Sequence, residues 1–284
     1  MSNQRTKDCT CEFFIHEQFK PQLCNLGLIS MDTVFSFQAG QNLQKPNMAK
    51  HRTRIQIDFT EPQTTLFLKR YDKPSIWLQL RNWLTHRTRA STADFDRLPC
   101  DQLAKAGINT PKVIAYGSQW GRLFEKRSFV ITEKLPGAWP LEKKLPHFFY
   151  NSSPLQNVKQ KRQFINAIAD FTAKFHKTGC CHRDFYLAHI FTDEKQNFYL
   201  IDLQRTFKPL LLRWRFRLKD LTQLYYSAPG QIFSRADRLR FYIRYTGRKK
   251  VSLLDKLFIK ALKAKAWRMA DHDIRHNRPV PFAQ

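Results

Sequence analysis

The alternation of apolar and polar residues predicts strands in the first half of the chain. TVFSFQ at 33–38 has this alternation, and we predict a strand there. Four later stretches alternate as expected for a half-exposed sheet: RIQIDF at 54–59, TTLFLKRY at 64–71, VIAYGS at 113–118 and SFVITEKL at 128–135. Two helices are predicted between them, at about 75–88 and 92–106, with Gly107 at a suitable position to end the second.

The second half of the chain has a helical period. Phe164, Ile168, Phe171 and Phe175 are separated by four, three and four residues, so they lie on one face of a helix that ends near Gly179. After a short strand, FYLIDL, most of the remaining sequence is typical of basic amphipathic helices. We therefore predict an α+β protein with two lobes and a cleft between them. An irregular segment (1–33) precedes a β-rich first lobe (34–135) and a helical second lobe (136–284).

Composition adds a strong positive charge to this picture. The 284 residues include 49 Lys and Arg against 23 Asp and Glu, a net charge of +26, and the excess is greatest after residue 204. Such a chain suits a polyanionic partner: nucleic acid, an anionic membrane or a phosphorylated glycolipid. No apolar run reaches the roughly 18 residues of a membrane helix, and the N-terminus lacks an export signal, so we expect a cytoplasmic protein.

The stretch HKTGCCHRDFYLAHIF, residues 176–191, carries the candidate chemistry. Its adjacent cysteines and nearby histidines could suggest zinc, but no second ligand pair stands at metal spacing, and buried small residues are the commoner reading. Asp184 lies in this stretch, and Asp202 follows eighteen residues later at the end of an apolar strand. Together with Lys69 in the strand LFLKRY, two such carboxylates suit the transfer of a phosphoryl group from a magnesium-bound nucleotide.

These motifs resemble a known family. HKTGCCHRDFYLAHI and LIDL are similar to the catalytic-loop and magnesium-binding segments of protein-kinase-like enzymes. More closely, HRDFYLAHIF, LIDLQR, FLKRY, AGINTPKVIAYG and SFVITEKL resemble the lipopolysaccharide core heptose kinase family of Gram-negative bacteria, over roughly residues 34–247. The resemblance implies a two-lobed protein-kinase-like fold and an ATP-dependent kinase that uses Mg²⁺ and phosphorylates a sugar hydroxyl.

The resemblance also implies roles for individual residues. Lys69 would hold the α- and β-phosphates of ATP, with Asp96 as its ion-pair partner, and Glu133 would lie at the hinge whose backbone binds adenine. Asp184 would be the catalytic residue that orients or accepts the proton of the acceptor hydroxyl. Asp202 would bind Mg²⁺.

Further positions are assigned in the same way. His189 stands where protein kinases have a metal-binding Asn, which makes it a candidate second metal ligand, although Mg²⁺ prefers oxygen. Asp220 resembles the buried Asp that braces the catalytic loop through its backbone N–H groups. The phosphate-covering loop would lie between Gln38 and Arg52, where Gly40 is the only glycine.

The sequence also bears on the acceptor. Only 36 residues separate Asp184 from Asp220, which leaves no room for a long activation segment that would dock a peptide, so a glycan hydroxyl is expected. With the basic second lobe, this favours the lipopolysaccharide inner core at the cytoplasmic face of the inner membrane, with peripheral contact to an anionic membrane surface. The alternatives are a Kdo or other sugar kinase, a catalytically weak kinase-like scaffold and a nucleic-acid-binding protein. The last is disfavoured because no nucleic-acid-binding motif is present.

Overall fold

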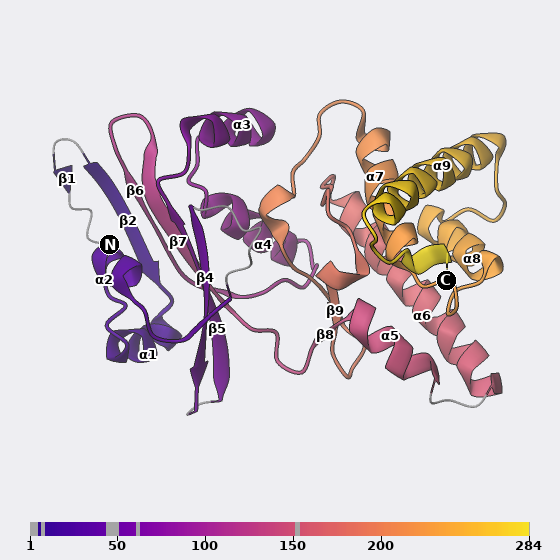
Figure 1. The fold of residues 1–284 in the computed structure, drawn as a ribbon, viewed down its shortest axis with the longest axis horizontal. Helices are drawn as coiled ribbons and strands as arrows, with labels where there is room; N and C mark the ends of the chain where they lie inside the picture. The colour runs from indigo at the N-terminus through magenta and orange to yellow at the C-terminus, as the bar shows by residue number, and fades with distance from the viewer. Residues whose placement is uncertain (1–4, 7–8, 44–50, 61–62, 151–153, 284) are drawn as a thin grey trace. The chain divides into compact units, whose positions relative to one another are not determined.

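The computed structural model describes residues 5–6, 9–43, 51–60, 63–150 and 154–283. The chain divides into two compact units, one formed by residues 1–102 and 111–136 and the other by residues 103–110 and 137–284. The first unit holds a seven-stranded sheet and the second is mainly helical, so the predicted α+β class is confirmed. Figure 1 shows both units coloured along the chain.

The sheet of the first unit is antiparallel, with strand order β1-β2-β6-β7-β5-β4-β3. Its strands are β1 (Arg5–Thr6), β2 (Cys9–Ile15), β3 (Gln41–Asn42), β4 (Arg52–Phe59), β5 (Thr64–Asp72), β6 (Val113–Trp120) and β7 (Glu125–Glu133). The helices that accompany it are η1 (Glu17–Phe19), α1 (Lys20–Asn25), α2 (Met31–Ser36), α3 (Ile76–His86) and most of α4 (Asp94–Lys105).

The two-residue period of β5 decides which side chains reach which layer. Leu66 and Leu68 are fully buried in a core shared with the α1–α2 region, and Arg70 donates to the carbonyl oxygens of Val34, Phe35 and Phe37 on the same side. The alternate residue Tyr71 packs instead with Ala93, directly before α4. Because successive side chains point to opposite faces of a strand, Lys69 shares the face of Tyr71.

Two sequence predictions for the N-terminal region are wrong. The stretch 33–38, predicted as a strand, lies largely in helix α2, which a reciprocal capping box starts: the Ser30 hydroxyl accepts from the Thr33 N–H at 3.2 Å, and the Thr33 hydroxyl accepts from the Ser30 N–H at 3.0 Å. Residues 1–33, predicted to be irregular, contain β2, which pairs with β6 about a hundred residues later. A local pattern does not reveal so distant a partner.

The described part of the second unit contains five α-helices and a small sheet. The helices are α5 (Leu141–Tyr150), α6 (Pro154–Lys177), α7 (Arg213–Ser227), α8 (Arg235–Thr246) and α9 (Leu253–Arg275), with the short turns η2 (Leu187–His189), η3 (Leu203–Arg205) and η4 (Pro281–Ala283). The sheet is antiparallel in the order β10-β9-β8, from β8 (Trp139–Pro140), β9 (Ile190–Thr192) and β10 (Phe198–Leu200). Helix α6 packs on α8, and α7 packs on α9.

This arrangement fixes the surroundings of the 176–191 stretch. The predicted apolar stripe lies on α6, where Ile168 and Phe175 are buried. The stretch itself ends in η2 and the start of β9, and only η3 and a short loop separate Asp202 from α7. Among the helices in the described part of the chain, none is both long and apolar enough to cross a membrane.

Candidate functional site

A buried carboxylate holds the loop that carries Asp184. Asp220, in the middle of α7, is fully buried and accepts the backbone N–H of His182 at 2.7 Å and that of Arg183 at 2.8 Å. Arg183 has a φ of 71°, a left-handed conformation that is unfavourable for a side chain of this kind. Two charge-assisted hydrogen bonds therefore hold a strained turn, as the resemblance implied for Asp220.

A neighbouring amide completes this support. Gln223, one turn after Asp220, accepts the backbone N–H of Phe185 at 3.0 Å and donates to the carbonyl oxygen of Arg183 at 2.8 Å. The backbone on both sides of Asp184 is thus tied to helix α7. Gln223 was not among the residues predicted from the sequence, although its position three residues after Asp220 on a helix indicates that the two share a face.

Two histidines of the stretch are buried. His182 is completely buried; its Nε2 lies 2.9 Å from the carbonyl oxygen of Ile201 and must donate to it, so its Nδ1 can accept the N–H of Asp184. Burial lowers the pKa of His182, which favours the neutral ring. His176 is also buried and lies against Tyr245 and Asp220.

The carboxylate of Asp184 is paired with an arginine. Nη1 of Arg205 donates to both carboxylate oxygens, at 2.9 and 2.8 Å, and the Asp184 side chain is 22% exposed. A carboxylate has about four acceptor positions, so the contact leaves lone pairs for a further hydroxyl. Arg205 was not among the residues predicted from the sequence. The only sequence signal for it is a cation three residues after Asp202.

His189 and Asp202 face each other at the end of the small sheet. Nδ1 of His189 lies 2.7 Å from the carbonyl oxygen of Asp184, which can only accept, so the ring proton sits on Nδ1. In the neutral ring, Nε2 then presents a lone pair toward Oδ2 of Asp202, 3.9 Å away. Two acceptors that face each other in this way suit an intervening cation. No group of three or more His, Cys, Asp or Glu side chains suited to a metal occurs among the described residues.

The first unit contains the predicted lysine–carboxylate pair. Nζ of Lys69 lies 2.7 Å from Oδ2 of Asp96, and both side chains are almost fully buried, at 10% and 6% exposure. The hydroxyl of Tyr71 donates to the same oxygen at 2.9 Å. The ion pair predicted from the sequence is therefore present, and the short Asp side chain reaches because α4 packs directly on this face of the sheet.

The other predicted nucleotide-binding positions are Glu133 and the loop between Gln38 and Arg52, and the structure describes only part of that loop. Glu133 is the last residue of β7, and its N–H donates to the carbonyl oxygen of Lys112 at 3.0 Å, so this N–H is already paired within the protein. Residues 44–50 of the predicted phosphate-covering loop lie outside the described residues. Gly40 has a φ of 97°, and a Cβ there would lie 2.5 Å from the carbonyl oxygen of Gln56. This position requires glycine for its backbone.

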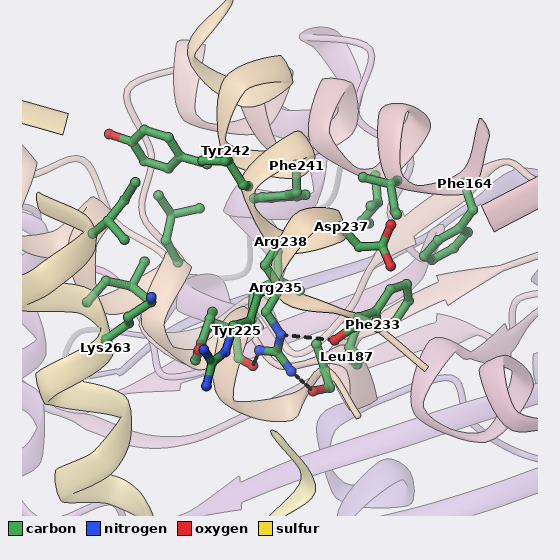
Figure 2. Close-up of a pocket in the computed structure, with 18 residues that line it drawn as sticks. Phe164, Leu187, Tyr225, Phe233, Arg235, Asp237, Arg238, Phe241, Tyr242 and Lys263 are labelled. Carbon is green, nitrogen blue, oxygen red and sulfur yellow. Dashed lines mark hydrogen bonds between the residues drawn. The ribbon is translucent and has the colours of Figure 1, made fainter. Parts of the chain in front are cut away.

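A separate apolar cavity lies among α6, α7, α8 and α9. It encloses about 310 Å³, and its walls include Phe164, Leu187, Leu221 and Phe233. Figure 2 shows the Arg238 guanidinium bonded to backbone oxygens rather than to a charge; it donates to the carbonyls of residues 225, 228 and 233 at 2.9, 2.8 and 3.4 Å. The volume of the cavity is at the lower end of the range for small-molecule pockets, about 300 to 1,000 Å³.

The architecture and the anchored loop define the class of protein. An antiparallel sheet with a buried lysine–carboxylate pair, followed by a helical unit whose internal aspartate holds an Arg-Asp loop, is the arrangement of phosphotransferases with a protein-kinase-like fold. A solved structure described as WaaP in complex with acyl carrier protein has this fold. The two superpose with a TM-score of 0.66 at 22% identity, covering 90% of this chain and 98% of that one.

Sequence comparisons identify the family within this class. The model of the lipopolysaccharide kinase (Kdo/WaaP) family matches residues 44–245, well over half of the chain. The lipopolysaccharide core heptose(I) kinase WaaP of Escherichia coli K12 is 27% identical over 232 residues, 78% of this chain and 86% of that protein. The protein of the same name from Pseudomonas aeruginosa is 32% identical over 151 residues, 51% of this chain and 55% of that protein. The chain belongs to the lipopolysaccharide kinase (Kdo/WaaP) family and is a phosphotransferase, as the sequence resemblance indicated.

Proposed function

We propose that this chain transfers the γ-phosphate of ATP to a hydroxyl of a heptose in the lipopolysaccharide inner core. The observation that carries the proposal is the Asp184 loop, whose backbone is fixed by Asp220 and whose carboxylate is oriented by Arg205. The relatives named heptose(I) kinases support the acceptor, since one of them aligns over 78% of this chain. A Kdo or other sugar hydroxyl is the nearest alternative acceptor.

In the proposed reaction, Asp184 positions the acceptor hydroxyl and accepts its proton. The side chain is partly exposed, and Arg205 leaves lone pairs on both oxygens for the incoming hydroxyl. Because the loop is already anchored, little ordering is needed when the acceptor binds. General base catalysis by such a group contributes roughly 10²- to 10⁴-fold to a rate.

Asp202 and His189 would hold Mg²⁺ on the nucleotide. The Asp202 side chain is 42% exposed, and Nε2 of His189 lies 3.9 Å from its Oδ2. One carboxylate with phosphate and water oxygens suffices for Mg²⁺, so Asp202 is the principal ligand and His189 the weaker one. When bound, the ion neutralises charge on the transferring phosphoryl group.

Lys69 would contact the α- and β-phosphates, and Asp96 would keep its ammonium in position. The pair is buried and shares Tyr71 as a third member, so the lysine is held without a ligand. The carbonyl oxygen of Glu133 would accept from the adenine amino group. These assignments follow the order of functional residues in protein-kinase-like enzymes.

The test is Mg²⁺-dependent transfer of labelled γ-phosphate to purified core acceptors. Asp184→Asn and Asp202→Asn should each lower kcat by roughly 10²-fold or more. Asp170→Asn should leave it unchanged, since this carboxylate forms an exposed pair with Arg244 on the same unit. Transfer to Kdo but not to heptose would show that Kdo, and not heptose, is the acceptor. A folded protein without transfer to any sugar would favour the scaffold alternative.

Acyl carrier protein is proposed as a partner on separate grounds. The similar solved structure is described as a complex with that protein, and the apolar cavity of Figure 2 suits the acyl group that such a carrier brings. Leu221→Arg, at the cavity wall, should abolish binding of acylated carrier protein in a pull-down. Leu254→Arg, at an exposed position that does not line the cavity, is the matched control and should bind like wild type. Equal binding by wild type and Leu221→Arg would contradict this proposal.

A further inference from the structure

A short surface segment next to the catalytic loop combines exposed apolar side chains with positive charge. It comprises residues 207–215, FKPLLLRWR, and is called here the Leu–Trp loop. Figure 1 shows it as the orange connection that runs into the first turn of α7. Six consecutive residues, 210–215, are exposed. The function proposed above does not use any of them.

Four apolar residues of the loop are each more than half exposed. The exposed fractions are 59% for Leu210, 78% for Leu211, 53% for Leu212 and 59% for Trp214. Single exposed apolar residues are common on proteins, but a contiguous group marks a surface that meets another apolar phase.

The exposure does not come from a loosely attached segment. Phe207 exchanges two backbone hydrogen bonds with Cys181 of the catalytic stretch, at 2.9 and 3.1 Å, and its ring packs edge-on against Phe216 at 4.9 Å. Pro209 is buried, and its carbonyl oxygen accepts from Arg213 at 3.2 Å. Both ends of the loop are therefore fixed, and the chain holds the leucines outward.

Backbone geometry supports the same conclusion. Leu212 has a φ of 54°, in the left-handed region that a branched side chain rarely adopts. Its carbonyl oxygen accepts the N–H of Arg215 and so begins helix α7. An unfavourable conformation is kept at a position whose side chain packs little against the protein, which is typical of a functional constraint.

The charge around the loop determines what can cover it. Lys208, Arg213 and Arg215 are exposed beside the leucines, and no acidic residue occurs from 203 to 219. A groove of about 1040 Å³ continues from Leu212, Trp214 and Arg215 to the cations Lys265, Arg268 and Arg278. Leucine and tryptophan next to several lysines and arginines are the composition of segments that lie in the interface of an anionic bilayer.

We propose that the Leu–Trp loop docks this protein on an anionic phospholipid bilayer. Leu210, Leu211, Leu212 and Trp214 enter the headgroup–acyl boundary, and the flanking cations meet lipid phosphates. Phe207, the first residue of the loop, is paired with Cys181, and Cys181 is three residues before Asp184 in the sequence. The docked loop is therefore attached directly to the segment that carries Asp184. It would hold the catalytic loop at the surface where a lipid-linked acceptor presents its sugars. This consequence rests on the proposed function, whereas the docking itself does not.

Vesicle flotation without ATP or acceptor tests the docking directly. The probes are vesicles of phosphatidylethanolamine with phosphatidylglycerol, compared with vesicles of neutral phosphatidylcholine. Leu210→Ser with Leu211→Ser should weaken partition to the anionic vesicles by about tenfold or more, from the lost apolar contact. Leu253→Ser with Leu254→Ser is the matched control, because these two leucines, at the start of α9, are 77% and 75% exposed beside Lys249 and Lys250. It should partition like wild type.

Each outcome decides the proposal. Loss of partition in the loop variant with an unaffected control supports it, as does weaker binding at high salt. Equal partition of wild type and loop variant overturns it, and so does a loss confined to the Leu253 and Leu254 variant. Binding to an acidic protein such as acyl carrier protein through the loop, with no partition to anionic vesicles, also overturns it. Phosphorylation of a soluble, delipidated core should be the same in both variants, so a failure of the kinase proposal is detected separately.

Discussion

The carboxylate of Asp220 accepts two backbone N–H groups of the catalytic loop and so fixes its conformation. Replacing Asp220 is therefore the most direct test of how the site is held. Asp220→Asn keeps the shape of the side chain but replaces one oxygen by an NH₂ group. Oδ1 accepts the N–H of Arg183 and Oδ2 accepts that of His182, so one of these donors must then face another donor. Nε2 of His176 also lies 3.3 Å from Oδ2, so the orientation of the amide affects a third group as well.

The size of the effect follows from two losses. A buried backbone N–H left without an acceptor costs about 1 to 3 kcal/mol. The remaining hydrogen bond loses its charge assistance, which removes roughly a further 1 kcal/mol. Together they give about 2 to 4 kcal/mol. For a unit of about 150 residues this lowers Tm by roughly 4 to 16 °C.

The assay is thermal unfolding of wild type, Asp220→Asn and Asp170→Asn, with kcat measured below the transition. Asp170→Asn removes a carboxylate that also accepts two hydrogen bonds, both at 2.7 Å from Arg244, but this pair is exposed and should change Tm little. We expect a large loss of Tm and of kcat for Asp220→Asn alone. Equal Tm values for the two variants would refute the idea that burial makes the Asp220 contacts important.

Four further predictions concern the same structure. Asp96→Asn leaves a buried lysine without its charge partner and should cost about 3 to 5 kcal/mol of stability, measured by urea unfolding, and lower kcat/KM for ATP. Burial lowers the pKa of His182, so below about pH 6.5 the unfolded chain binds more protons than the folded one and stability falls on acidification. Between about pH 7.5 and 5.5, the Tm of His182→Gln, measured by thermal unfolding, should therefore fall less than that of wild type. Arg205→Ala should lower kcat about tenfold with KM for ATP unchanged, and Arg205→Lys should restore part of it. Mass spectrometry after iodoacetamide at about pH 8 should find exposed Cys24 alkylated and Cys181 intact, since burial raises the pKa of the Cys181 thiol to about 12.

Local pattern predicted most of the elements that position the site. Strands β4, β5, β6 and β7 and helices α3, α4 and α6 lie where alternation or helical period placed them, because each buries one face against a partner that the pattern already implies. The failures are at the N-terminus. Helix α2 begins at a cap formed by Ser30 and Thr33, which overrides an alternating sequence, and β2 is stabilised by a strand far along the chain.

The sequence by itself determined the family and the candidate residues Lys69, Asp184 and Asp202, because each of these residues stands in a motif of fixed order. Only the tertiary structure decided what surrounds them. The pairing of Arg205 with Asp184, the support from Gln223 and the outward leucines of the Leu–Trp loop all depend on how α7 and the loop before it pack against the catalytic stretch. A linear pattern records which face of an element is apolar, whereas hydrogen-bond partners between distant segments are set by packing in three dimensions.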